Sequence, residues 1–135
     1  MNPKYAHLYD GEILNDIAVG LVLHLDPDVL EQKGGTYTCE PALRVQGQHF
    51  FVCISVDGNT SRWLPLYSNE GDGRTLVEPN AKKGHAKWQQ SICYWHKDQI
   101  WEASGDAVYW AAGRAHDKSR KGTRNTLDVA SVPNI

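Results

Sequence analysis

Three side chains in one stretch of the chain have the types needed to cleave RNA by acid–base chemistry: His49, Arg62 and Ser68. A histidine transfers protons near neutral pH, and an arginine stabilises the charge that develops on an attacked phosphate. Arg44, upstream of this group, is a second candidate for the phosphate-binding cation. These residue types predict acid–base cleavage of a phosphodiester, and ordinary surface roles are the alternative for each of them.

A second group combines basic and aromatic side chains: Lys82, Lys83, His85, Lys87 and Trp88. Lysines bind phosphates, and an exposed indole stacks on an unpaired base, so we expect this group to bind a nucleic acid or another partner. The alternative is a solvated loop with no partner. The distribution of charge favours binding here, because residues 1–80 carry 5 basic and 11 acidic side chains whereas residues 81–135 carry 9 and 5.

Composition excludes several classes of protein. A chain of 135 residues is long enough for one domain with a real core. Three cysteines without a CxxC spacing argue against a disulfide framework and a zinc knuckle. Six histidines without a helical or strand spacing give no metal signal, so we expect no metal and no cofactor. The sequence shows no leader pattern and no long apolar run, which predicts a cytoplasmic protein without a membrane partner.

The elements that must position these residues are mostly strands. Residues 41–46, 49–56 and 62–67 read as a three-strand antiparallel meander, with turns at Gly47 and at Asp57-Gly58-Asn59. Residues 17–25 and 88–95 read as further strands, and residues 28–40 as a long loop. Ser104 is a candidate N-cap for a helix over residues 107–116, whose buried stripe is Val108, Ala111, Ala112 and Ala115.

This order of elements predicts a mainly β domain, with the sheet curled into a small half-open antiparallel barrel and a C-terminal helix closing it. We expect an N-terminal arm over residues 1–16, the barrel with its helix over residues 17–116, and a flexible basic tail over residues 117–135. Trp63 and Trp110 are expected in the core and Trp88 at the surface, while Cys53 and Cys93 are expected as buried thiols.

Four segments resemble, in the same order, segments of the PemK/MazF-type toxins: VLHLDPDVLEQKGG, PALRV, LPLYSN and ICYWHKDQIWEAS. The resemblance covers roughly residues 19–115. It implies an SH3-like barrel that cuts single-stranded RNA without a metal, and a homodimer with a groove between the subunits.

The resemblance also implies an arginine before Pro41 and a threonine before Ser68, where this chain has Glu40 and Tyr67. A carboxylate repels phosphate, so we expect a non-catalytic or decayed barrel that binds single-stranded RNA or a protein partner, as regulators and inhibitors of phages and mobile elements do. Glu40 and Tyr67 then become candidate partner-binding residues. The alternative is an active metal-independent endoribonuclease.

Overall fold

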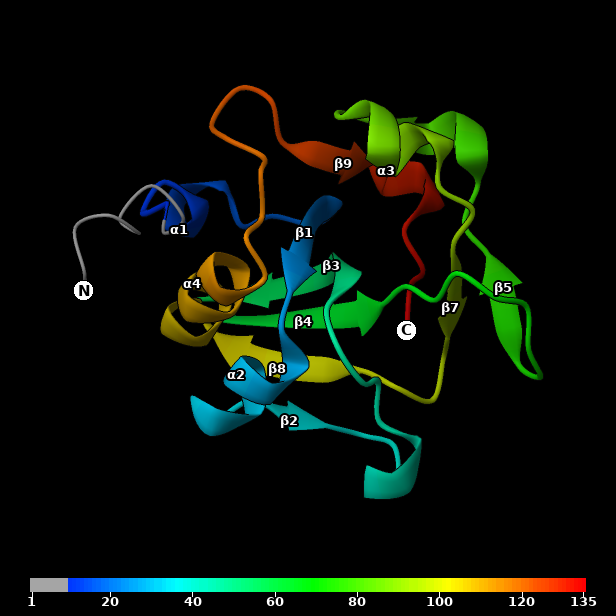
Figure 1. The fold of residues 1–135 in the computed structure, drawn as a ribbon, viewed down its shortest axis with the longest axis horizontal. Coiled ribbons are helices and arrows are strands. Elements are labelled where there is room, and N and C mark those ends of the chain that lie inside the picture. The colour runs from blue at the N-terminus through cyan, green and yellow to red at the C-terminus, as the bar shows by residue number, and fades with distance from the viewer. Residues whose placement is uncertain (1–9) are drawn as a thin grey trace.

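A computed structural model of the chain describes residues 10–135, which form a mainly β structure, as the sequence predicts (Figure 1). The strands are β1 (Leu21–Leu25), β2 (Thr36–Tyr37), β3 (His49–Asp57), β4 (Thr60–Pro65), β5 (Arg74–Leu76), β6 (Lys82–Lys83), β7 (Tyr94–His96), β8 (Trp101–Ser104) and β9 (Asn125–Leu127). The α-helices are α1 (Ile13–Asp16), α2 (Pro27–Gln32), α3 (Ala86–Gln90) and α4 (Gly105–Arg114), and short 3₁₀ helices are η2 (Pro41–Leu43), η3 (Pro79–Ala81) and η4 (Val129–Ser131).

Seven strands form one antiparallel sheet in the order β2-β8-β4-β3-β1-β9-β6, and β5 and β7 pair separately. The hairpin of β3 and β4 turns at Gly58, which has a φ of +60°, so this predicted turn is confirmed. β2 and β6 lie at opposite ends of the strand order.

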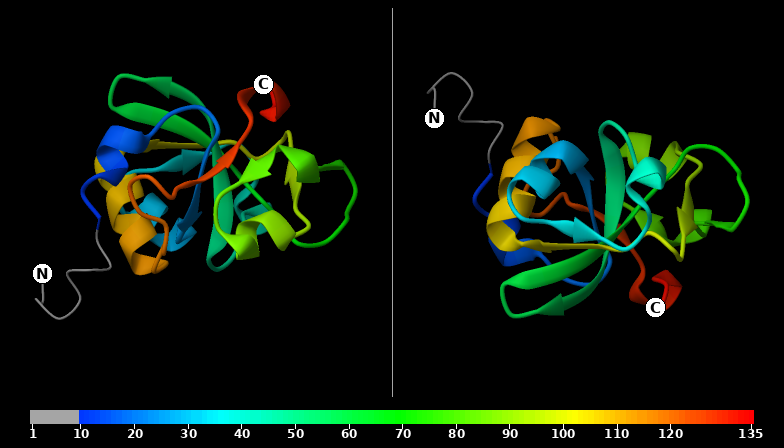
Figure 2. Two further views of the ribbon diagram at one scale, coloured as in Figure 1. Left: turned by 90° about the horizontal axis from the view of Figure 1, so that it is seen from above. Right: turned by 90° about the horizontal axis from the view of Figure 1, so that it is seen from below.

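The sheet is covered on both faces (Figure 2). Side chains alternate along β1 and β3, so that Leu23 and Phe51 point to one face while Val22 and Val52 point to the other. α1, α2 and α4 cover the first face, and α3 with the β5–β7 pair lies against the second. A strand residue on the second face therefore faces α3 and the C-terminal part of the chain.

The C-terminal helix is confirmed as α4. The Ser104 hydroxyl oxygen accepts a hydrogen bond from the Ala107 N–H at 3.1 Å and caps the helix. All four residues of the predicted stripe are buried. Trp63 is buried as predicted, but Trp110 is only half-buried, and the Lys33 ammonium lies 5.2 Å from its ring centre.

The predicted strand over residues 41–46 is wrong. Pro41 begins the 3₁₀ helix η2, and Leu43 is 70% exposed, which an inward-facing strand residue would not be. Proline fixes its own φ and supplies no ladder N–H, which suits the first position of a helical turn better than a strand inside a sheet. β1, and not this segment, pairs with β3.

Two other predicted segments also differ. Residues 88–95 contain the end of α3 and the start of β7, because Trp88 packs into the core from a helix. The expected loop over residues 28–40 contains most of α2, which Asp26 caps by accepting from the Asp28 N–H at 2.9 Å, and then β2.

The C-terminal segment joins the main sheet. Residues 117–135, expected as a tail, contain β9, which pairs with β1 and with β6. Of the expected N-terminal arm, residues 1–9 lie outside the described part. Asp10 and Asp16 form ion pairs with Arg124 at 2.8 and 2.9 Å, so the segment around α1 is held to the residue that precedes β9. None of the helices in residues 10–135 has the length and apolar character of a membrane span.

Candidate functional site

A cleft of about 260 Å³ opens where the second face of the sheet meets the end of α4 and the start of α3. Its lining gathers residues from β1, β3, α3, β9 and the segment that follows α4. These are His24, Phe50, His85, Lys87, Trp88, Ala115, His116, Asp117, Lys118, Ser119 and Asn125. We call it the histidine cleft, because three of the six histidines of the chain line it.

His24 enters the cleft from β1. Strand alternation places it on the same face of the sheet as Val22, which is a core residue. An apolar side chain would be usual at this position. Its ring lies 5.0 Å from the ring of Phe50, the residue opposite it on β3. Burial lowers the pKa of His24 below its usual value; the Asp117 charge opposes this shift, and His49 adds to it. His24 is therefore a neutral imidazole at pH 7.

His116 enters the cleft from the end of α4 in a strained conformation. Its φ is +55°, which makes it the non-glycine residue with positive φ in the described part of the chain. The His116 N–H donates to the Gly113 carbonyl at 3.1 Å, and the Asp117 N–H donates to the Ala112 carbonyl at 3.0 Å. This bonding is a Schellman motif, in which glycine is the usual residue at the left-handed position. A strained backbone at a residue whose side chain lines a cleft points to a functional role.

His85 and Lys87 come from the start of α3. The His85 Nδ1 caps this helix by accepting from the Lys87 N–H at 3.2 Å, which leaves Nε2 for another partner. The His85 N–H donates to Asn125 Oδ1 at 2.7 Å, and Asn125 is a buried residue of β9. The C-terminal strand therefore fixes the position of His85.

Aromatic rings form the apolar wall of the cleft. Trp88 is buried, and its indole N–H donates to the Thr126 carbonyl at 3.0 Å. Phe50 is half-buried and packs edge-on against Trp88, with ring centres 5.3 Å apart. The ring of Phe50 is therefore partly accessible from the cleft, and it packs on the buried indole of Trp88.

The cleft presents positive charge to solvent. Its exposed charged side chains are Lys87 and Lys118, and the imidazoles of His85 and His116 are exposed beside them. Asp117 is the acidic residue of the lining, but it is buried, and its carboxylate accepts from the N–H of His24 at 2.6 Å and from the N–H and hydroxyl of Ser119. Because these internal bonds occupy Asp117, the cleft suits an anion with an adjacent flat ring.

The histidines within residues 10–135 do not form a metal site. In the part of the chain that the structure describes, no group of three or more histidine, cysteine or acidic side chains is placed to hold a metal ion. What the cleft offers instead is imidazoles beside ammonium groups, and this combination binds phosphate and transfers protons.

The predicted catalytic residues do not come together. Arg62 lies opposite Ser55 on β3, six residues along the strand from His49 and about 20 Å away at roughly 3.3 Å per residue. Its guanidinium donates to the Ile135 carbonyl at 3.3 Å. His49 lies beside Tyr67, with ring centres 5.8 Å apart, and Ser68 is exposed.

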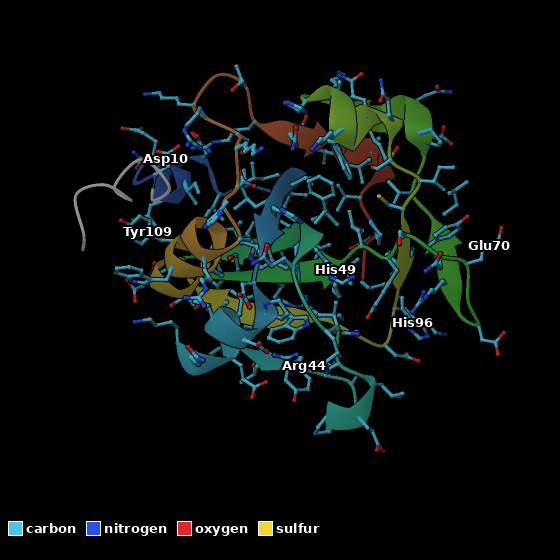
Figure 3. The ribbon with its side chains drawn as sticks, viewed as in Figure 1. Asp10, Arg44, His49, Glu70, His96 and Tyr109 are labelled. Carbon is cyan, nitrogen blue, oxygen red and sulfur yellow. The ribbon has the colours of Figure 1, made fainter. Side chains whose placement is uncertain are left out.

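Arg44 has a structural role. Its guanidinium forms ion pairs with Asp28 and with Glu31, the latter at 3.1 Å, and lies 5.5 Å from the ring centre of Trp101. Two carboxylates neutralise this arginine, and its side chain is only 9% exposed. The two ion pairs link the residue that follows η2 to α2. Figure 3 shows Arg44 near α2 and β2.

The predicted basic–aromatic group is divided by the fold. His85, Lys87 and Trp88 line the cleft, although Trp88 is buried and not exposed as expected. Lys82 is only 5% exposed, and its ammonium donates to Ser91 and lies 4.5 Å from the ring centre of Trp88. Lys83 is exposed and pairs with Asp128 at 3.1 Å. These two lysines therefore do not belong to the cleft.

The two positions singled out by the resemblance lie elsewhere. Glu40 is exposed. Tyr67 is half-buried in a separate hollow, where the Gln99 amide donates to its hydroxyl oxygen and the guanidinium of Arg74 lies 3.9 Å from its ring centre. Burial raises the pKa of Tyr67.

Comparisons of the chain with protein-family models, with curated proteins and with solved structures give no match. The resemblance to PemK/MazF-type toxins stays a prediction, and the histidine cleft rests on its own geometry.

Sequence reasoning missed His24, His116 and Lys118 as site residues. One signal for His24 was present, because it is the polar residue in an apolar strand at an inward-facing position. His116 and Lys118 gave no such signal, since their place depends on how the end of α4 meets β1.

Proposed function

We propose that the chain binds single-stranded RNA in the histidine cleft and that cleavage is not required for this binding. The observation that supports the proposal is the convergence of Lys87, Lys118 and three imidazoles around the accessible ring of Phe50. The ammonium groups suit phosphates, and the ring suits a base. At about 260 Å³ the cleft is smaller than most ligand pockets, which run from about 300 to 1,000 Å³, so it holds at most one nucleotide.

The preference for RNA and for a single strand comes from different arguments. A stacked base pair hides its faces, so a ring in a small cleft favours an unpaired nucleotide. The choice of RNA over DNA follows from the resemblance to PemK/MazF-type toxins, as do an SH3-like barrel and a homodimer, and all three belong to this proposal.

Binding is tested with a labelled oligouridylate by fluorescence anisotropy at several salt concentrations. Lys87→Ala and Lys118→Ala are each expected to weaken binding several-fold and to reduce the slope of log K against log salt by about 0.7, the value for one phosphate contact on a single strand. Lys83→Ala is the matched control, because Lys83 is equally basic and exposed but lies outside the cleft. Equal losses in all three variants would contradict binding in the cleft.

A second candidate function is metal-independent cleavage of RNA. The specific observation is that His24, a neutral imidazole, shares one cleft with His85 and His116. A neutral imidazole can take the proton of a 2′-hydroxyl as its oxygen attacks phosphorus, while a protonated imidazole gives a proton to the leaving 5′-oxygen. Incubation with RNA in the presence of a chelator, followed by detection of 2′,3′-cyclic phosphate ends, tests this candidate. Intact RNA, or the same cleavage with His24→Gln, would reject it and leave binding alone.

A further inference from the structure

A second hollow of about 450 Å³ lies beside the β5–β7 pair. Its polar lining includes Tyr67, Glu70, Asp72, Arg74, His96 and Asp98. Leu76 and Tyr94 continue it along the face of the small sheet. We call it the acidic hollow. Figure 3 shows Glu70 and His96 on this side of the molecule, next to β5 and β7.

The cationic groups of the hollow already have internal partners. The guanidinium of Arg74 lies against the Tyr67 ring and donates to the Asn69 carbonyl at 2.9 Å. The His96 Nδ1 accepts from the Asp98 N–H at 3.0 Å. An incoming anion would therefore have to displace existing contacts before it reached either group.

The three carboxylates are less engaged. Glu70 is exposed and accepts from the Tyr94 hydroxyl at 3.5 Å, the limit of a hydrogen bond. The Asp98 side chain is 70% exposed and lies 3.9 Å from His96 Nδ1. Asp72 is exposed and has no hydrogen bond or ion pair with any residue that the structure describes. The hollow places three carboxylates around one guanidinium, so its field attracts a cation.

The neighbouring strand has a free backbone edge. β5 pairs with β7 on one side, and within residues 10–135 no strand pairs with its other side. Figure 1 shows β5 at the outer margin of the fold. Leu76 is 49% exposed at this edge, and Leu43, which lines the hollow, is 70% exposed. Such an edge is a template for an extended peptide, whose main chain pairs with the strand and whose side chains enter adjacent pockets.

We propose that the β5 edge and the acidic hollow together bind an extended segment of a partner protein that carries lysine or arginine side chains. The main chain of the segment continues the β5–β7 sheet, its basic side chains reach Asp72 and Glu70, and its apolar side chains cover Leu76 and Leu43. RNA is disfavoured because its phosphates would face three carboxylates. A second copy of this chain paired β5 to β5 is disfavoured because it would bring like carboxylates together.

The test uses a fluorescein-labelled peptide of alternating lysine and leucine, with the glutamate–leucine peptide as its charge-reversed counterpart. We expect saturable binding of the lysine peptide alone, and Asp72→Lys is expected to weaken it roughly tenfold. Asp57→Lys is the matched control, since Asp57 is an exposed aspartate at the β3–β4 turn. Hydrogen exchange is expected to show slower exchange at the amides of β5 in the complex.

Several results would overturn the proposal: no saturable binding of the lysine peptide, equal binding of the two peptides, equal losses in the two variants, or unchanged exchange in β5. Displacement of the peptide by oligouridylate would assign the hollow to RNA, and a dimer that Asp72→Lys dissociates would assign it to a second copy. The inference does not depend on the proposed RNA site, because Asp72→Lys is expected to leave RNA binding in the histidine cleft unchanged.

Discussion

The carboxylate of Asp117 accepts a hydrogen bond of 2.6 Å from the backbone N–H of His24, which joins the end of α4 to β1 across 93 residues of sequence. The other oxygen of the same carboxylate accepts from the N–H of Ser119 at 2.8 Å. One buried side chain therefore holds the wall of the histidine cleft together.

Asp117→Asn is expected to destabilise the protein by about 1–3 kcal/mol, because an amide has one acceptor oxygen where the carboxylate uses two and a buried N–H would lose its partner. Urea unfolding measures the change. Asp128→Asn serves as the control, since Asp128 forms an exposed pair with Lys83 and should change stability by less than about 1 kcal/mol. Similar values for both variants would show that the Asp117 contact contributes little.

The stability of the fold is expected to decrease as the pH falls below about 6.5, the usual pKa of histidine. Burial lowers the pKa of His24 in the folded state. Below about pH 6.5 the unfolded chain therefore binds a proton at His24 more readily than the folded chain does, and this difference favours unfolding. Urea unfolding at about pH 7.5 and about pH 5.5 tests this. His24→Gln is expected to lose less stability between the two pH values than the wild type, and an equal loss in the two proteins would show that His24 is not the cause.

Replacement of His116 by glycine is expected to raise stability while weakening RNA binding. Glycine adopts the left-handed conformation without the penalty of a side chain, so we expect a gain of about 1 kcal/mol in the free energy of unfolding. Loss of the imidazole removes a polar group from the cleft, so anisotropy should show a higher Kd for oligouridylate. A gain in stability with unchanged RNA affinity would mean that His116 has no part in binding.

Gly20 and Gly34 provide a matched test of how β9 docks. Their φ values are +95° and +94°, so an alanine is similarly strained at either position. A Cβ at Gly20 would lie 2.5 Å from the Leu127 carbonyl oxygen, whereas a Cβ at Gly34 meets open space. Gly20→Ala is therefore expected to cost about 1–3 kcal/mol more than Gly34→Ala in thermal or urea unfolding. Equal costs would show that the C-terminal segment does not pack against β1 in solution.

Several features followed from the sequence by itself, because their causes are local. The cap at Ser104 and the apolar stripe that follows it predict α4, and the Gly58 turn between two β-branched runs predicts the β3–β4 hairpin. Burial of Cys53 and Cys93 followed from their apolar neighbours. These signals lie within a few residues of the structure that they specify.

The tertiary structure decided everything that depends on distant contacts. The residues around Trp88 are equally compatible with a strand. In the structure Trp88 lies in α3, where its indole packs against Phe50 on the sheet. Asn125 belongs to a segment without a strong pattern, yet it enters the sheet because β1 offers a free edge there. The histidine cleft has the same origin, since His24, His85 and His116 lie far apart in sequence and meet only because β1, α3 and the end of α4 converge. Side-chain chemistry is readable from sequence, but which side chains share a site depends on how the elements pack.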